Sequence, residues 1–230
     1  MFGKGNHNDR KARSEKVLSK HKIAINPNLP GIDDSYEKKI KPTDEVLKRA
    51  LTAFITVQIA IDICNDNGAL ESVEFFTPIM ERFGIMDELT EDEKPYFDSE
   101  KCEDISQDAA YQMQWRLEMC VPLFWALGLW KKLEYPKEMT DTTPLIHLIG
   151  SCESLDELKG HVKPRDPSEI LDAADLLLRM DWACVEARIK NDPSLSSDLF
   201  SDVVVEQHKG INWLICAYDA EDWDNVAPHT

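Results

Sequence analysis

Three polar side chains interrupt an apolar segment near the end of the chain, and their types could support chemistry. The segment reads VVVEQHKGINWLICAYDAEDWDNVAPHT, and Glu206, His208 and Asn212 lie within its apolar first half. A histidine can act as a general acid or base near neutral pH, and a neighbouring carboxylate can orient its ring. The three residues therefore mark either a chemical site or a polar contact between helices.

Two other apolar segments contain charged residues that could join the same site. Arg116 and Glu118 flank the apolar face of one predicted helix, and Asp175 and Arg179 are four residues apart on another. Because an unpaired buried charge costs several kcal/mol, we expect these groups to bind one another. The candidate cluster consists of Arg116, Glu118, Asp175, Arg179, Glu206, His208 and Asn212.

The candidate cluster has three interpretations. The first, which the cost of burying charge favours, is a structural ion-pair network that holds the helices together. The second is an acid–base site, in which His208 carries a proton, Glu206 or Asp175 orients its ring, and one of the two arginines holds an anionic ligand. The third is that some of the groups lie at the surface of the protein.

Familiar catalytic and metal-binding motifs are absent from the sequence. It contains no H-E-x-x-H, no P-loop, no G-x-G-x-x-G and no G-x-S-x-G. The six cysteines stand at positions 64, 102, 120, 152, 184 and 216 without a C-x-x-C pair, which favours reduced, buried thiols. We therefore expect no metal site and no cofactor, and we favour a protein that is not an enzyme.

Charge is unevenly distributed along the chain. The protein has 26 basic and 43 acidic residues, a net charge of −17. Residues 1–22 hold seven basic and two acidic residues (+5), so the remainder carries −22. Such an acidic body repels nucleic acid, and binding to DNA or RNA is not expected. It suits a basic protein partner steered by charge, while solubility alone is the simpler explanation.

The sequence predicts a cytoplasmic protein that does not cross a membrane. Its N-terminus lacks the apolar core of a secretory signal. The longest apolar run, LTAFITVQIAIDIC, is interrupted by polar residues and is too short to span a bilayer.

Helical periodicity dominates the chain and predicts an all-α fold of about six to eight helices. The expected organisation is a disordered tail (1–8), a basic arm with an extended Pro- and Asn-rich connector (9–42), and a single globular all-α domain (43–230). The main helices are predicted at about 9–21, 43–65, 70–83, 104–128, 166–190 and 200–219. Pro122 should kink the fourth of these helices, and residues 131–150 are expected to be irregular with one short strand.

Several strings of the sequence together resemble a known family. They are WRLE…LFWALGL, EILDAADLLLRMDWAC, VVVEQHKGINWL and DWDNVAPHT, together with RSEKVLSKHKIAINPNLP and TDEVLKRALTA near the start. Together they resemble the bacterial family known as domain of unknown function 4272, from about residue 10 to the end. The resemblance implies a single-domain, stand-alone cytoplasmic protein, and it implies no particular activity.

Three functions are compatible with these features. The leading expectation is a non-enzymatic interaction domain that binds a basic protein, as an immunity protein or antitoxin would. The second is an enzyme or small-anion binder that uses the candidate cluster between helices. The third is a structural subunit of an obligate oligomer. The sequence does not define the oligomeric state.

Overall fold

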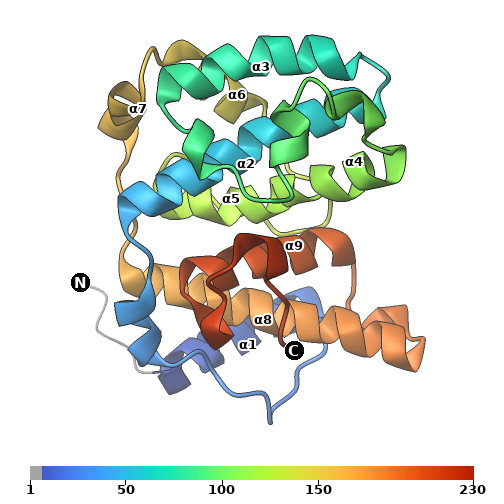
Figure 1. Ribbon diagram of the computed structural model, residues 1–230. Helices are drawn as coiled ribbons and strands as arrows, with labels where there is room; N and C mark the ends of the chain where they lie inside the picture. The colour runs from blue at the N-terminus through green and yellow to red at the C-terminus, as the bar shows by residue number, and fades with distance from the viewer. Residues whose placement is uncertain (1–6) are drawn as a thin grey trace. The chain divides into compact units, whose positions relative to one another are not determined.

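The fold is built entirely from helices. The structure is a computed structural model that describes residues 7–230, and within this range it contains nine α-helices, seven 3-10 turns and no β-strand (Figure 1). The all-α prediction is confirmed. The predicted disordered tail (1–8) lies outside the described residues except for its last two positions, which begin the first helix.

The helices follow the chain in a regular order. The α-helices are α1 (His7–His21), α2 (Thr43–Cys64), α3 (Ala69–Phe83), α4 (Gln107–Gln114), α5 (Arg116–Ala126), α6 (Thr143–Ser151), α7 (Leu155–His161), α8 (Pro167–Lys190) and α9 (Ser201–Leu214). The 3-10 turns span Asp34–Lys39, Met86–Glu88, Lys94–Phe97, Cys102–Asp104, Pro193–Leu195, Ala217–Asp219 and Trp223–Asn225.

The chain forms two compact units, each with its own apolar core. Unit 1 comprises Met1–Lys41, Leu133–Thr140 and Arg165–Thr230, and unit 2 comprises Pro42–Lys132 and Asp141–Pro164. The predicted division into an arm (9–42) and a single domain (43–230) stays a prediction.

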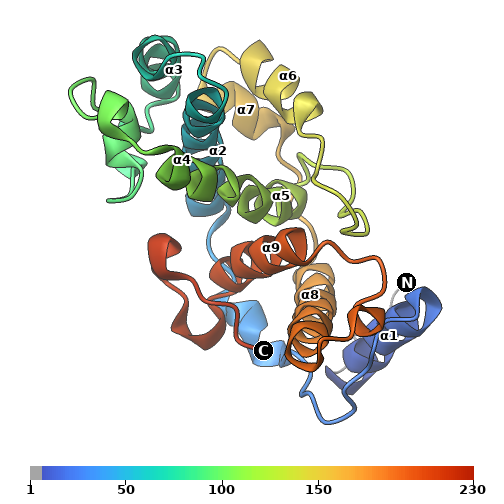
Figure 2. The same ribbon diagram turned by 90° about the vertical axis from the view of Figure 1, so that its right-hand side faces the viewer.

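In unit 1, helix α8 lies between α1 and α9 (Figure 2). Asp166 caps the start of α8 by accepting a hydrogen bond from the Ser168 N–H (2.8 Å), and Pro167 occupies the first helical position, as the sequence predicts. Asn191 ends the helix in the left-handed conformation (φ 52°). The core of the unit is a cluster of buried side chains from the three helices and from the turn after α1: Leu18, Ile23, Met180, Ala183, Cys184 and Val204.

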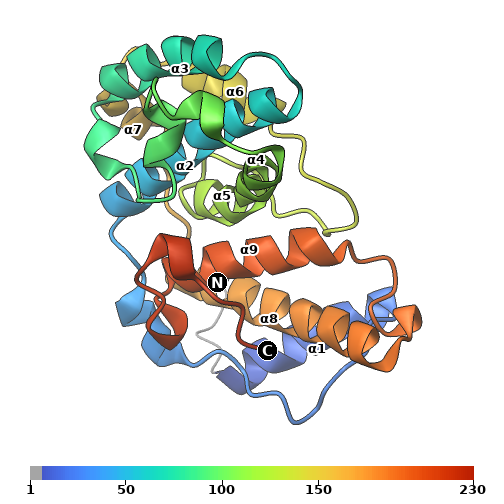
Figure 3. The same ribbon diagram turned by 45° about the vertical axis from the view of Figure 1, so that its right-hand side comes forward.

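In unit 2, α2 is the central helix and is buried on most of its surface. Figure 3 shows α3 and α6 on one side of α2 and α4 and α5 on the other. A helix with apolar residues all round has to be covered on several faces, and this explains the layered packing. The core at the C-terminal end of α2 contains Ile59, Ala60, Ile63, Val73, Tyr96, Cys102, Ala110 and Met113.

The predicted helix over residues 104–128 is wrong in its boundaries. It is divided at Trp115, where the Glu118 N–H donates to the Trp115 carbonyl three residues back (3.0 Å) and the turn tightens. Pro122 lies inside α5, which continues to Ala126. The break in this segment is therefore at a tightened turn rather than at the proline.

Residues 131–150 are also more regular than predicted, because α6 begins at Thr143 and the expected strand is not found in the described chain. Leu145 and Ile149, one turn apart, bury the inner face of this helix. At the end of the chain, α9 stops at Leu214 rather than continuing to residue 219, because Cys216 adopts a left-handed conformation (φ 50°).

Gly128 allows the chain to turn sharply after α5. Its φ is +73°, and a Cβ atom at this position would lie 2.2 Å from the carbonyl oxygen of Lys163. The Lys163 N–H also donates to the Leu127 carbonyl (2.9 Å), which brings the end of α7 close to the end of α5. Only glycine fits this combination of conformation and close approach.

Candidate functional site

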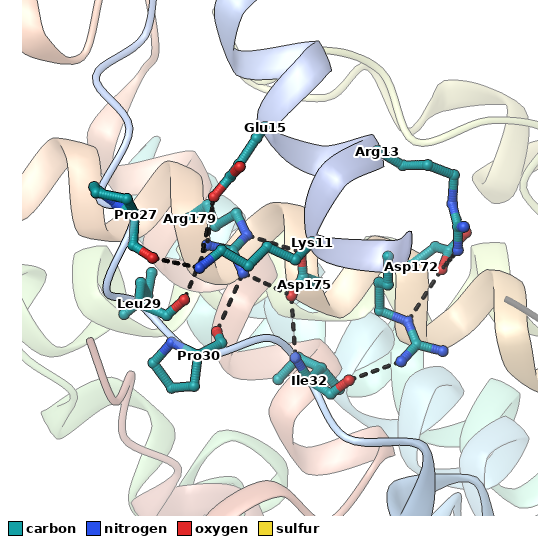
Figure 4. A network of polar contacts seen from close by, with 11 residues as sticks. Lys11, Arg13, Glu15, Pro27, Leu29, Pro30, Ile32, Asp172, Asp175 and Arg179 are labelled. Carbon is teal, nitrogen blue, oxygen red and sulfur yellow. Dashed lines mark hydrogen bonds and ion pairs between the residues drawn. The ribbon is translucent and has the colours of Figure 1, made fainter. Parts of the chain in front are cut away.

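Arg179 and Asp175 are the centre of a polar network that attaches the connector to α8 (Figure 4). Both side chains are buried, and the Arg179 guanidinium donates to both carboxylate oxygens of Asp175 (2.9 and 3.2 Å). It also donates to the carbonyls of Leu29 (3.4 Å) and Pro30 (3.2 Å), while Asp175 accepts from the Ile32 N–H (3.0 Å). Every hydrogen-bond partner of this pair in the described chain belongs to the protein itself, which is the pattern of a structural ion-pair network.

Two cations of the N-terminal arm also bind carboxylates of unit 1. Arg10 is 1% exposed, and its guanidinium donates to Asp172 (3.1 Å), to Asp34 (2.8 Å) and to the Ile32 carbonyl (2.7 Å). Arg13 donates to the same Asp172 carboxylate (2.6 Å; Figure 4). Two cations of this basic segment, Arg10 and Arg13, therefore bind Asp172 and hold α1 against α8.

The histidine of the candidate cluster forms a pair with a residue absent from the candidates. His208 on α9 and Asp181 on α8 are both fully buried, and the His208 Nδ1 lies 2.7 Å from an Asp181 oxygen. Glu206, one of the two carboxylates expected to orient His208, instead binds Lys209 (2.6 Å). The other expected carboxylate, Asp175, is held by Arg179. Asp181 carried the same sequence signal as His208, since it lies within an apolar run, LLLRMDWAC, that also holds Arg179.

Several polar atoms around this pair have no hydrogen-bond partner within the described chain. They are the second oxygen of Asp181, the Nε2 of His208, and both amide atoms of Asn212, which lies one turn beyond His208 on α9. If Nδ1–H donates to Asp181, the Nε2 is an acceptor, which is the arrangement of a general base. Because the three side chains are at most 1% exposed, a reactant cannot reach them without movement of the protein.

Arg116 and Glu118 belong to unit 2, at the first turn of α5. Arg116 donates to the exposed Asp92 (2.6 Å), and Glu118 is fully buried. Of the seven candidate residues, Asp175 and Arg179 bind each other directly. Arg116, Glu206 and His208 contact Asp92, Lys209 and Asp181, which are not among the candidates.

Unit 2 contains an apolar groove between α2, α3 and α6, with a volume of about 190 Å³. Phe75, Ile79 and Arg82 face it from α3 at i, i+4 and i+7, and the complete lining is Phe54, Ile55, Gln58, Phe75, Phe76, Ile79, Arg82, Ile146, Ile149 and Gly150. Phe75 is 65% exposed and Ile146 is 46% exposed, so both stand open to solvent. The Phe75 and Phe76 rings contact each other edge to face at 4.9 Å.

Exposed carboxylates lie on the elements that form this groove. They are Glu71, Glu74 and Glu81 on α3 and Glu153 directly after α6. Unit 2 as a whole has 22 acidic and 10 basic residues, a net charge of −12, and unit 1 has 21 and 16, a net charge of −5. The groove therefore belongs to the more acidic part of the protein. Sequence reasoning missed it, although Phe75 gave a signal because it lies off the apolar stripe of α3, which consists of Leu70, Val73, Phe76 and Met80.

Metal clusters and membrane-spanning helices are not found in residues 7–230. No group of three or more His, Cys, Asp or Glu side chains is arranged to hold a metal ion in this range. None of the helices described has the length and apolar character needed to cross a bilayer. The six cysteines are free thiols.

Comparison with known proteins identifies the family of this chain. No curated protein and no solved structure is significantly similar to this chain. A family model covers residues 10–226, nearly the full length, which agrees with the resemblance in the sequence. The chain therefore belongs to the family described as Domain of unknown function (DUF4272).

Proposed function

We propose that the protein is a non-enzymatic interaction domain whose groove in unit 2 binds an amphipathic helical segment of a basic partner protein. The observation that carries this proposal is the open apolar groove, with Phe75 and Ile146 exposed on its rim. An open groove lined by apolar side chains is the kind of surface on which helix-in-groove recognition depends. An immunity protein or antitoxin that binds a basic toxin is one example of such a partnership.

The size of the groove favours side chains of a protein over a cofactor. Sites for drug-sized ligands occupy roughly 300–1,000 Å³, whereas this groove has a volume of about 190 Å³. A volume of this size accommodates a few apolar side chains. Helix-in-groove recognition requires the same feature, because residues spaced i, i+3 or i+4 on the partner insert into one apolar groove.

The charge around the groove favours a basic partner. Glu71, Glu74, Glu81 and Glu153 leave their carboxylates exposed on α3 and next to α6, in a unit of net charge −12. Lysines and arginines beside the apolar residues of a partner would meet these carboxylates, and long-range attraction would accelerate association at low salt. The free cysteines favour a reducing compartment, and we propose the cytoplasm.

Site-specific photo-crosslinking in intact cells tests this function. A benzoylphenylalanine residue replaces Phe75 in one variant and Ile189 in the control, since Ile189 on α8 is a 71% exposed apolar residue in the other unit. We expect a protein to be captured at position 75 alone. Mass spectrometry of the crosslinked peptide should show apolar residues at helical spacing beside lysines or arginines. The same proteins at both positions, no capture at position 75, or a crosslinked peptide without this pattern would contradict the proposal.

A second candidate function is binding or turnover of a small ligand in unit 1. It is favoured by one observation, the unpartnered buried atoms of Asp181, His208 and Asn212. Buried polar groups are usually hydrogen-bonded, and a ligand or ordered water could supply the missing partners. A small molecule that raises the melting temperature of the wild type but not of His208→Gln would support this function. We rank it second because these side chains are closed to solvent and those of the groove are open.

A further inference from the structure

Arg82 is the single charged residue that lines the groove of unit 2. Its side chain is 28% exposed, and its guanidinium lies over the Phe83 ring, 5.0 Å from the ring centre. The nearest recorded carboxylate, Glu153, is 3.9 Å from Nη1 and is itself 83% exposed. This distance is at the upper limit for an ion pair. Within the described chain, Arg82 therefore has no carboxylate as close as Asp175 is to Arg179 (2.9 Å).

The Nε of Arg82 is buried and has no hydrogen-bond partner among the described residues. A buried donor without an acceptor costs about 1–3 kcal/mol, and more when the donor is charged. The lining of the groove is otherwise apolar except for Gln58, whose amide donates to the Phe54 carbonyl (3.2 Å). The terminal nitrogens of the guanidinium are not among the buried atoms without a partner, and the side chain is partly exposed in the groove. These nitrogens can therefore donate to an oxygen acceptor of a bound segment, so Arg82 can distinguish segments that bring one from segments that do not.

The surrounding charge decides which oxygen fits. A free carboxylate on the partner would approach Glu153, Glu81 and a unit of net charge −12, and it would be repelled. The last four carbonyls of a helix are neutral, lack intrahelical donors and carry the negative end of the helix dipole. Basic side chains are common in the last helical turn, and near Arg82 they would meet the two exposed glutamates.

We propose that Arg82 is the specificity-determining residue of the groove and donates a terminal guanidinium N–H to a carbonyl oxygen at the C-terminal end of the docked helix. The inference rests on the proposed function. It gives the bound helix a direction, with its last turn at Arg82, its apolar side chains on Phe75 and Ile146, and its terminal lysines beside Glu153.

Two synthetic peptides can test this direction on the full-length protein. Both are amphipathic helices with the same apolar residues at i, i+3, i+4 and i+7 and an amidated C-terminus. One carries two lysines in its last turn, and the other carries them in its first turn with two glutamates in the last. Fluorescence anisotropy at low salt measures their affinities for wild type, Arg82→Met, Phe75→Ser and two controls. Ile189→Ser removes an exposed apolar side chain from unit 1, and Lys101→Met removes an exposed charge from unit 2 outside the groove.

We expect the peptide with the basic last turn to bind wild type at least about tenfold more tightly than the other. Arg82→Met should weaken this peptide at least about tenfold, as expected for the loss of a charge-assisted hydrogen bond. The same variant should change the second peptide less than about twofold, and the two controls should change neither.

The possible failures are distinguishable. If Phe75→Ser weakens both peptides but they bind wild type equally, or Arg82→Met has no effect or strengthens binding, the role of Arg82 is wrong and the proposed function stands. If neither peptide binds wild type, or Phe75→Ser binds as wild type does, the groove is not a helix-binding site and both proposals fail. Circular dichroism and thermal melts establish that each variant is folded.

Discussion

Replacing Arg179 with methionine should destabilise unit 1 by about 4 kcal/mol, the sharpest consequence of its polar network. The substitution keeps the apolar stem of the side chain and removes the guanidinium. Asp175 then remains fully buried with the Ile32 N–H as its recorded donor, and the carbonyls of Leu29 and Pro30 lose theirs. Breaking a buried ion pair on one side costs about 3–5 kcal/mol, which already includes much of the penalty for the unpaired carboxylate.

The reciprocal change and the double change determine whether the two charges act as one pair. Asp175→Leu should also cost about 4 kcal/mol, because it leaves the Arg179 charge buried without its carboxylate. In the double variant no charge is left unpaired. Three backbone groups, at Leu29, Pro30 and Ile32, lose their partners at about 1 kcal/mol each. The double variant should therefore lose about 3 kcal/mol, well below the sum of the two single losses.

Urea unfolding followed by circular dichroism measures these free energies, and thermal melts provide a second readout. For a chain of this length each kcal/mol corresponds to about 2–4 °C, so each single variant should melt about 8–16 °C below wild type. The reasoning is refuted if either single variant loses less than about 1 kcal/mol, or if the two losses add in the double variant.

Three further predictions follow from other buried groups. Glu93→Ala should lower the free energy of unfolding by about 3 kcal/mol or more, because it leaves Arg49 buried without its 2.5 Å bond to the carboxylate. Urea melts measure this free energy, and a loss below about 1 kcal/mol would contradict the prediction. Asn212→Leu should leave the urea midpoint unchanged or raise it, since the amide has no partner within residues 7–230, and a loss of about 2 kcal/mol or more would show a bond that the structure lacks. Burial raises the pKa of Cys184 and of Tyr96 to about 12 each, from 9.0 and 10.0. The stability that these two protonated groups contribute is therefore fully present below pH 9 and is lost as the pH rises toward 12. The urea midpoint should fall between pH 9 and pH 11, and a constant midpoint would exclude this linkage.

Local signals in the sequence predicted local features of the fold. Asp166 and Pro167 define the start of α8. The side chain of Asp166 caps a backbone N–H two residues away, and the ring of Pro167 fixes its own φ, so both effects are local and can be read from the sequence. The division at Trp115 had no such signal, since neither glycine nor proline stands there. Helix α6 does carry a local signal, because Leu145 and Ile149 are one turn apart and follow Pro144 near the N-terminus of the helix.

The candidate sites depended on contacts that a single sequence does not specify. Asp175 and Arg179 were predictable as a pair because they are one helical turn apart. His208 and Asp181 are 27 residues apart on two helices, so their pairing depends on how α8 and α9 pack. The groove likewise needs α2, α3 and α6 together. The sequence could show that Phe75 departs from the apolar stripe of α3, but it could not show what Phe75 faces.

The fold accounts for the polar network of unit 1 but not for the groove of unit 2. Arg179 and Asp175 satisfy each other and three backbone groups of the connector, so their burial is explained without a ligand. Phe75 and Ile146 leave apolar area in water that would contribute about 25 cal/mol per Å² if it were covered. Arg82 similarly leaves its guanidinium without a close acceptor among the described residues of the same groove. One bound helix would cover the first two side chains and supply an acceptor to the third, so binding would resolve all three together.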